Sequence, residues 1–111
     1  MTHVLVLADD ACIQSTCVEI LARMGFRVSA AAPDATAPGS PDVILLWESD
    51  HRADCLSAVR QAYAKVPIIL CTWEHRRPWP EADAVVSLPF NVERVASALL
   101  RTLKHSRTLA A

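Results

Sequence analysis

The feature that most constrains this chain is the short apolar run Val-Ile-Leu-Leu-Trp at 43–47, which follows Pro41 and Asp42 and precedes Glu48. The run is too short to cross a membrane, and its apolar residues do not alternate with polar ones. This pattern predicts a strand covered on both faces, at the centre of a parallel sheet. In open α/β sheets ligands bind just beyond the carboxyl ends of the strands, so Trp47 falls where a reactive group would usually stand.

Similar apolar runs and amphipathic stripes predict the elements around this strand. Short apolar runs predict further strands at 4–7, 26–31, 67–72 and 84–87, the strand at 26–31 being weaker and near a sheet edge. Apolar residues at helical spacing predict helices at about 11–24, about 52–65 and from Asn91 to about 104. Asp9 or Asp10 would cap the first helix, and Gly25 stands just past its end.

Two connections are too rich in proline for a regular helix. Residues 32–41 contain three prolines and a glycine, and residues 73–81 contain two prolines. The predicted fold is therefore α/β, a flavodoxin-like, doubly wound, five-stranded parallel sheet of order 2-1-3-4-5 with shortened second and fourth helices. The first and last helices should cover one face and the middle helix the other. Residues 1–105 would form a single domain and residues 106–111 a flexible C-terminal tail.

Composition excludes several classes of protein. The 111 residues are 52% hydrophobic and 21% charged, enough for one core, and the net charge of -1 argues against nucleic acid or anionic membrane as partner. No apolar run approaches the roughly 20 residues of a transmembrane helix, and the N-terminus lacks the basic start of a signal peptide, so we expect a cytoplasmic location. The four cysteines form no Cys-x-x-Cys pair and the four histidines are scattered, so no metal or other cofactor is predicted.

Five segments, in this order and spacing, resemble a response-regulator receiver domain of the chemotaxis-regulator type. The segments are Val4–Asp10, Gly25–Val28, Pro41–Leu46, Pro67–Thr72 and Leu88–Phe90. The resemblance covers nearly the whole chain. It implies a place in bacterial two-component signalling or a phosphorelay, where an aspartate of the receiver domain is phosphorylated with the help of Mg²⁺.

The residues that carry this chemistry in the family are replaced here. Position by position, the resemblance places the phosphoacceptor on Trp47 and the phosphate-binding lysine on Leu88. Indole has no nucleophilic oxygen and cannot coordinate Mg²⁺, and leucine carries no charge. Glu48 is one residue further on, and in an extended chain that shift turns it to the opposite side. The resemblance implies a degenerate phosphorylation pocket made of Asp9, Asp10, Trp47, Thr72, Leu88 and Pro89.

Other parts of the family's pocket are retained in part. Thr72 matches the hydroxyl position and Pro89 the expected cis-proline. A count without gaps places the acidic pair on Ala8 and Asp9, with Asp10 just outside. At most one or two of the three acids of a Mg²⁺ site therefore remain, and either aspartate could serve as a helix cap instead.

The losses predict a pseudo-receiver without enzymatic activity. We expect a phosphorylation-independent protein–protein interaction module that acts alone or as a homodimer, with a signalling kinase or regulator as its protein partner. By the family's usage, the contact face would comprise the fourth connection, the fifth strand and the last helix. It would include Val85, Arg94, Ala98 and Arg101, with Val85 in place of the family's aromatic switch.

The tryptophans and the proline-rich loops leave alternatives open. Trp47, Trp73 and Trp79 could fill the emptied pocket as an apolar plug or anchor a partner, since tryptophan is enriched at interface hot spots. The truncated helices could leave a bare apolar sheet face for a partner. Alternatively, the proline- and tryptophan-rich loops could fold over the sheet in a monomer.

The loop at 73–80 supports a different class of function. Arg76 and Arg77 stand between Trp73 and Trp79, and such a cluster could bind a nucleotide or another anion by stacking and charge. The alternative function is thus a small-ligand sensor, although such a run is more often a solvated loop. A flavodoxin-like enzyme ranks last, because the chain has only two glycines and no glycine-rich phosphate loop.

Overall fold

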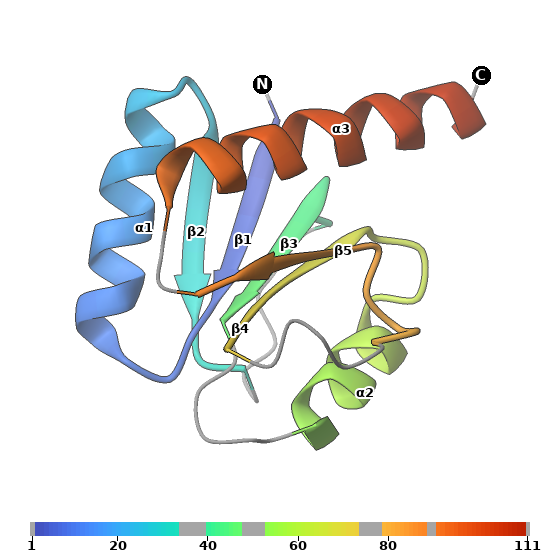
Figure 1. Ribbon diagram of the computed structural model, residues 1–111, viewed down its shortest axis with the longest axis horizontal. Helices are drawn as coiled ribbons and strands as arrows, with labels where there is room; N and C mark the ends of the chain where they lie inside the picture. Colours follow the sequence, from blue (N-terminus) through green and yellow to red (C-terminus); the bar gives the residue numbers. More distant parts are fainter. Residues whose placement is uncertain (1, 34–39, 48–52, 74–78, 89–90, 111) are drawn as a thin grey trace.

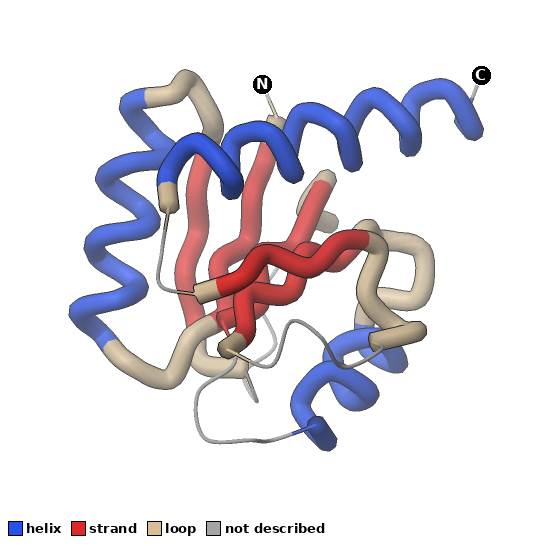
Figure 2. Tube along the Cα trace, in the orientation of Figure 1, coloured by secondary structure: helices blue, strands red, loops and turns tan. Residues whose placement is uncertain are grey.

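Five parallel strands in the order β2-β1-β3-β4-β5 form the centre of the protein, as the sequence predicts (Figures 1 and 2). The computed structural model describes residues 2–33, 40–47, 53–73, 79–88 and 91–110. Its elements in chain order are β1 His3–Leu7, α1 Ala11–Arg23, β2 Arg27–Ala31, β3 Val43–Trp47, α2 Ala53–Ala62, β4 Ile68–Thr72, β5 Ala84–Ser87 and α3 Val92–Ala110.

The burial of the strands follows their place in the sheet. All residues of β4 are buried, as are the first four of β3, which explains why these runs are continuously apolar. The outer strands β2 and β5 are partly exposed, and β2 lies at a sheet edge as predicted. The sequence contrast between central and outer strands therefore comes from their burial.

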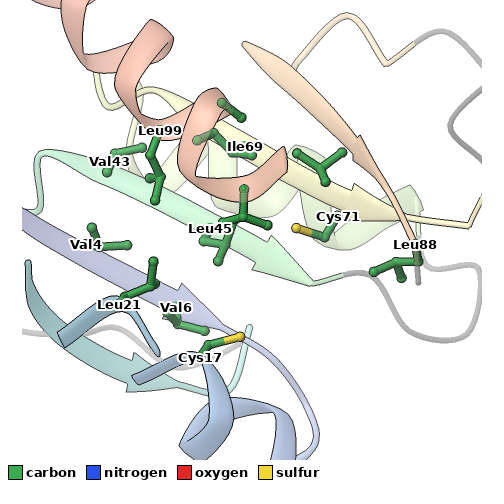
Figure 3. Close-up of a cluster of buried hydrophobic side chains, with 13 residues drawn as sticks. Val4, Val6, Cys17, Leu21, Val43, Leu45, Ile69, Cys71, Leu88 and Leu99 are labelled. Carbon is green, nitrogen blue, oxygen red and sulfur yellow. The ribbon is translucent and has the colours of Figure 1, made fainter. Parts of the chain in front are cut away.

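Helices cover both faces of the sheet in the predicted arrangement. One core cluster joins the sheet to α1 and α3 through residues such as Leu21, Leu45 and Leu99 (Figure 3). We call this side the α1–α3 face. The opposite cluster joins the sheet to α2 through Leu56 and Val59, and we call this side the α2 face.

Local signals at the two ends of α1 act as expected. Asp10 is the N-cap, and its carboxylate accepts hydrogen bonds from the backbone N–H groups of Cys12 at 2.7 Å and Ile13 at 3.3 Å. Gly25 follows the helix with a φ of 94°, in the left-handed region that glycine adopts without strain.

The helical content differs from the prediction at the C-terminus. The described parts of the two proline-rich connections contain no helix, while residues 34–39 and 74–78 lie outside the described residues. The last helix extends to Ala110, past its expected end near residue 104 and through most of the predicted tail. No glycine or proline interrupts residues 92–110, so local sequence gives no reason for it to stop.

Among the residues that the structure describes, no helix combines the length and the hydropathy that a membrane span requires.

Candidate functional site

The carboxyl ends of β3, β4 and β5 place Trp47 in a row with two residues that were not part of the predicted pocket, Cys71 and Val86. Trp47 lies in register with Cys71, and Cys71 in register with Val86. Neighbouring residues in register share one face of a sheet, and all three belong to or pack against the α1–α3 cluster. The carboxyl ends of these three strands therefore carry an apolar row.

Trp47 and Leu88 both contact the core. The Trp47 side chain is partly buried and packs against the α1–α3 cluster. Leu88 is 6% exposed and belongs to that cluster (Figure 3). The Leu88 backbone N–H donates to the Thr72 carbonyl oxygen at 3.0 Å, which ties the end of β5 to β4. Thr72 itself is 1% exposed, so its hydroxyl is not on the surface.

The two aspartates of the predicted pocket, Asp9 and Asp10, follow β1. Asp10 caps α1 through its side chain, and Asp9 is exposed. Within the described ranges, no group of three or more His, Cys, Asp or Glu side chains could hold a metal ion. Glu48 and Pro89 lie outside the described residues. At the described ends of β3 and β5, the side chains of Trp47 and Leu88 offer neither a nucleophilic oxygen nor a positive charge.

Two buried thiols lie in the same cluster. Burial raises the pKa of Cys17 from 9.0 to about 11. Burial, with a smaller contribution from the Cys17 thiolate, raises the pKa of Cys71 from 9.0 to about 12. Both thiols are therefore protonated and unreactive near neutral pH, whereas Cys12 is exposed.

We expect these thiols to make the protein less stable at alkaline pH. In the unfolded chain each thiol ionises near 9.0, but the folded protein keeps both protons, so their contribution to stability is complete below that pH and is lost as the pH rises towards about 11 and 12. The free energy of unfolding should fall by about 1 to 3 kcal/mol between about pH 8 and about pH 10.

Urea unfolding at the two pH values measures this loss. The double variant Cys17→Ala/Cys71→Ala should start less stable but lose less stability on alkalinisation. Cys12→Ala serves as the matched control, because Cys12 is exposed, and should keep the full pH dependence. An unchanged pH dependence in the double variant would refute the assignment.

The residues predicted for a contact face divide into exposed and buried groups. Val85 is 37% exposed, Trp73 is 65% exposed, and Arg94 and Arg101 lie on the exposed side of α3. Ala98 is 2% exposed and faces the core. Of the predicted face, Val85 of β5 and two arginines of α3 are exposed.

The prediction that Trp79 is an interaction residue is wrong. It is 8% exposed and belongs to the α2-face cluster, so it contributes to the core rather than to a contact surface. Arg76 and Arg77 lie outside the described residues. The burial of Trp79 removes one of the two rings on which a stacking site for a nucleotide would depend.

A groove along β5 was not foreseen from the sequence. One cavity of about 680 Å³ is lined by Arg60 of α2, by residues of β5 and α3, and by the connections after α2 and before β5, which contribute Lys65 and Asp83. A second cavity of about 350 Å³ lies between β5 and the first turns of α3. Val85 and Arg101 line both cavities, so the two are adjacent, and we call them together the β5–α3 groove. No sequence pattern links residues so far apart in the chain.

Strand order, parallel pairing and the placement of helices define the receiver-like, flavodoxin-type fold. The structure is similar to a response regulator receiver domain protein from Clostridium thermocellum, with a TM-score of 0.82 and 14% identity over 98% of this chain and 99% of that chain. It is also similar to the chemotaxis response regulator CheY4 of Vibrio cholerae, with a TM-score of 0.76 and 24% identity over 92% of this chain and 98% of that one.

A longer protein contains the same fold as one part. NtrX from Brucella abortus matches with a TM-score of 0.81 and 17% identity, over 99% of this chain but only 29% of the NtrX chain. Neither a protein-family model nor a curated protein matches the sequence. At these identities the likeness establishes the fold.

Proposed function

We propose that this chain is a pseudo-receiver, a phosphorylation-independent protein–protein interaction module of bacterial signal transduction, without enzymatic activity. The observation that carries the proposal is the apolar row of Trp47, Cys71 and Val86 at the carboxyl edge of a receiver-like sheet, with Leu88 packed beside it. Aspartyl phosphorylation needs a carboxylate nucleophile, a metal and a cation for the phosphoryl oxygens. Trp47 and Leu88 supply neither the nucleophile nor the cation.

A second argument concerns stability without a metal. Trp47 packs against the core, and Leu88 is buried at the end of β5, so both positions contribute apolar packing. A carboxylate acceptor and a lysine at these two positions would lose hydration, and that cost would have to be offset by their mutual attraction and by a bound metal ion. The fold keeps its shape without that arrangement, which suits a module that presents a constant surface.

The partner we propose is a protein of the same signalling system, such as a histidine kinase or another regulator. The accessible part of β5 and α3, with Val85, Arg94 and Arg101, is the contact face. Trp73, at 65% exposure, is a further anchor for such a partner. A homodimer stays a prediction from the sequence, and size-exclusion chromatography with light scattering tests it.

Incubation with acetyl phosphate and Mg²⁺ tests the loss of phosphorylation. We expect no stoichiometric phosphoryl adduct on the wild-type chain, measured by intact-mass spectrometry. A receiver domain with an intact aspartate, treated in parallel, shows that the reagent is active. An adduct that hydroxylamine releases would overturn the proposal, because hydroxylamine cleaves acyl phosphates and leaves phosphate esters intact.

A matched variant locates the acceptor if an adduct does form. Glu48→Gln removes the nearest carboxylate in the sequence and keeps the shape of its side chain. An adduct on the wild type that disappears in this variant would place acceptor chemistry on Glu48. An adduct that persists would place it elsewhere.

A further inference from the structure

We propose that β5 binds an extended acidic peptide segment of a partner as a sixth strand, with the β5–α3 groove holding the acidic side chains. The proposal rests on the interaction function above and names the chemistry of the partner. Its first support is the position of β5, which is the last strand of the sheet in the part of the chain that the structure describes. A terminal strand presents backbone N–H and C=O groups that another chain can pair with.

The backbone alternation identifies which groups of β5 point outward. The Leu88 N–H donates to Thr72 of β4, at the register expected for a parallel pair. Residues two apart bond to the same side in a strand, so Ala84 and Val86 also face β4. Val85 and Ser87 therefore turn their backbone groups away from the sheet.

The side chains of β5 lack the features by which natural edges prevent pairing. Such edges usually carry a charge, a proline or a bulge. The strand Ala-Val-Val-Ser has none of these, and Val85 is 37% exposed at its centre. The opposite edge strand β2 does begin with a charged residue, the exposed Arg27. The composition of β5 thus favours strand addition over a helical partner.

The charge beside this edge is mostly positive. The two cavities of the groove are lined by four cationic residues, Arg60, Lys65, Arg94 and Arg101, and two acidic ones, Asp83 and Glu93. Arg60 and Asp83 form an ion pair with each other at 2.7 Å, which leaves three cations and one acid. An acidic segment complements this groove.

The geometry of α3 fits a strand with alternating acids. Arg94 and Arg101 are about 10 Å apart along the helix, at a rise of 1.5 Å per residue. Side chains on one face of a strand repeat every ~7 Å, so two successive acidic residues can reach the two flexible arginines. The Arg94 guanidinium already reaches the strand, donating to the Ser87 hydroxyl oxygen at 2.6 Å.

Pairing of two copies of this chain through β5 is disfavoured by the same charges. An antiparallel pair of β5 strands around a twofold axis would place α3 of one copy beside α3 of the other. Arg94 and Arg101 of one copy would then face the same arginines of the second copy. Like charges directly opposite destabilise such a pair, so the groove is better suited to a different, acidic chain.

Fluorescence anisotropy with a labelled peptide in which valine and glutamate alternate tests the proposal on the full chain. We expect saturable binding that weakens as salt is raised. The same peptide with lysine in place of glutamate should bind at least about tenfold more weakly. A peptide methylated on the backbone nitrogens that would pair with Val85 keeps every charge and should also lose at least about tenfold, because strand pairing needs those N–H groups.

Matched variants of the protein distinguish the contribution of backbone pairing to peptide binding from the contribution of the arginine charges. Val85→Pro removes an outward N–H from the edge, and Val85→Thr keeps it at similar volume, so only the proline variant should lose binding. Arg94→Glu/Arg101→Glu should abolish binding of the acidic peptide, with thermal melting as the check of folding.

Two results would overturn the strand-addition proposal. One is the absence of saturable binding of the acidic peptide, and the other is equal binding of the methylated and unmethylated peptides. Tighter binding of oligothymidylate than of the acidic peptide would also overturn it, since the partner would then be a nucleic acid. None of these results changes the outcome of the acetyl phosphate experiment, so the proposed function is tested independently of the strand-addition proposal.

Discussion

Truncation of Leu99 to alanine is expected to lower the free energy of unfolding by about 3 to 4 kcal/mol. Leu99 is 0% exposed and lies in the α1–α3 cluster, where it packs between α3 and the sheet (Figure 3). Removing its three terminal carbons loses apolar burial and leaves a cavity that the surrounding strands cannot fill completely. For a chain of 111 residues this is a large part of a total stability of about 5 to 15 kcal/mol.

The neighbouring residue provides a matched control for this prediction. Leu100→Ala makes the same chemical change in the same helix, but Leu100 is 63% exposed. Its effect should stay within about 0.5 kcal/mol. Urea unfolding followed by circular dichroism measures both variants. Equal losses in the two variants would show that α3 does not dock on the sheet through the side chains of this cluster.

The order and type of the elements could be predicted because the burial of each element determines how its apolar residues are spaced along the sequence. Strands β3 and β4 are covered on both faces and read as unbroken apolar runs. The helices are covered on one side and read as stripes, in which Cys17 and Leu21 mark the core face of α1. Short right-handed connections then leave few possible strand orders, and the predicted order is the one found.

The candidate pocket could be predicted only in part. Trp47 ends β3 and Leu88 follows β5, so the predicted strand ends already placed both residues at the same edge of the sheet. Their contact with one apolar cluster could therefore be expected. The role of Trp79 was not, because a proline-rich loop has no period from which the direction of a side chain can be read. Its burial on the α2 face depends on space left beside α2.

The β5–α3 groove could not be predicted from the sequence for a related reason. Its lining residues come from α2, β5, α3 and the connections that flank α2 and β5, and they meet only because the sheet places these segments side by side. Arg94 and Arg101 were expected on the contact face, yet Arg60 and Lys65 at its other end had no local signal. Contacts between distant segments depend on side-chain conformations that a periodic pattern does not encode.

Replacing Arg60 by alanine is the second substitution expected to have a large effect. The Arg60 guanidinium donates to the Glu81 carbonyl oxygen at 2.6 and 3.0 Å, to the Val66 carbonyl oxygen at 2.9 Å and to the Asp83 carboxylate at 2.7 Å. One side chain thus joins the end of α2, the start of β4 and the turn before β5. Asp83 in turn accepts from the Ile68 N–H at 2.8 Å, which fixes the first residue of β4.

We expect Arg60→Ala to cost about 2 to 3 kcal/mol of unfolding free energy, because part-buried carbonyl groups lose their donor and the Asp83 carboxylate loses its counter-charge. Arg60→Lys should recover only part of this loss, since an ammonium group cannot reproduce the planar fork that reaches three acceptors.

Arg23→Ala is the matched control: its ion pair with Glu19 is also 2.7 Å long, but the two side chains are 77% and 64% exposed, so the loss should stay below about 0.5 kcal/mol. Urea unfolding compares the three variants, and an equal loss for Arg60→Ala and Arg23→Ala would mean that Arg60 is only a surface ion pair and does not hold β4 and β5 in place.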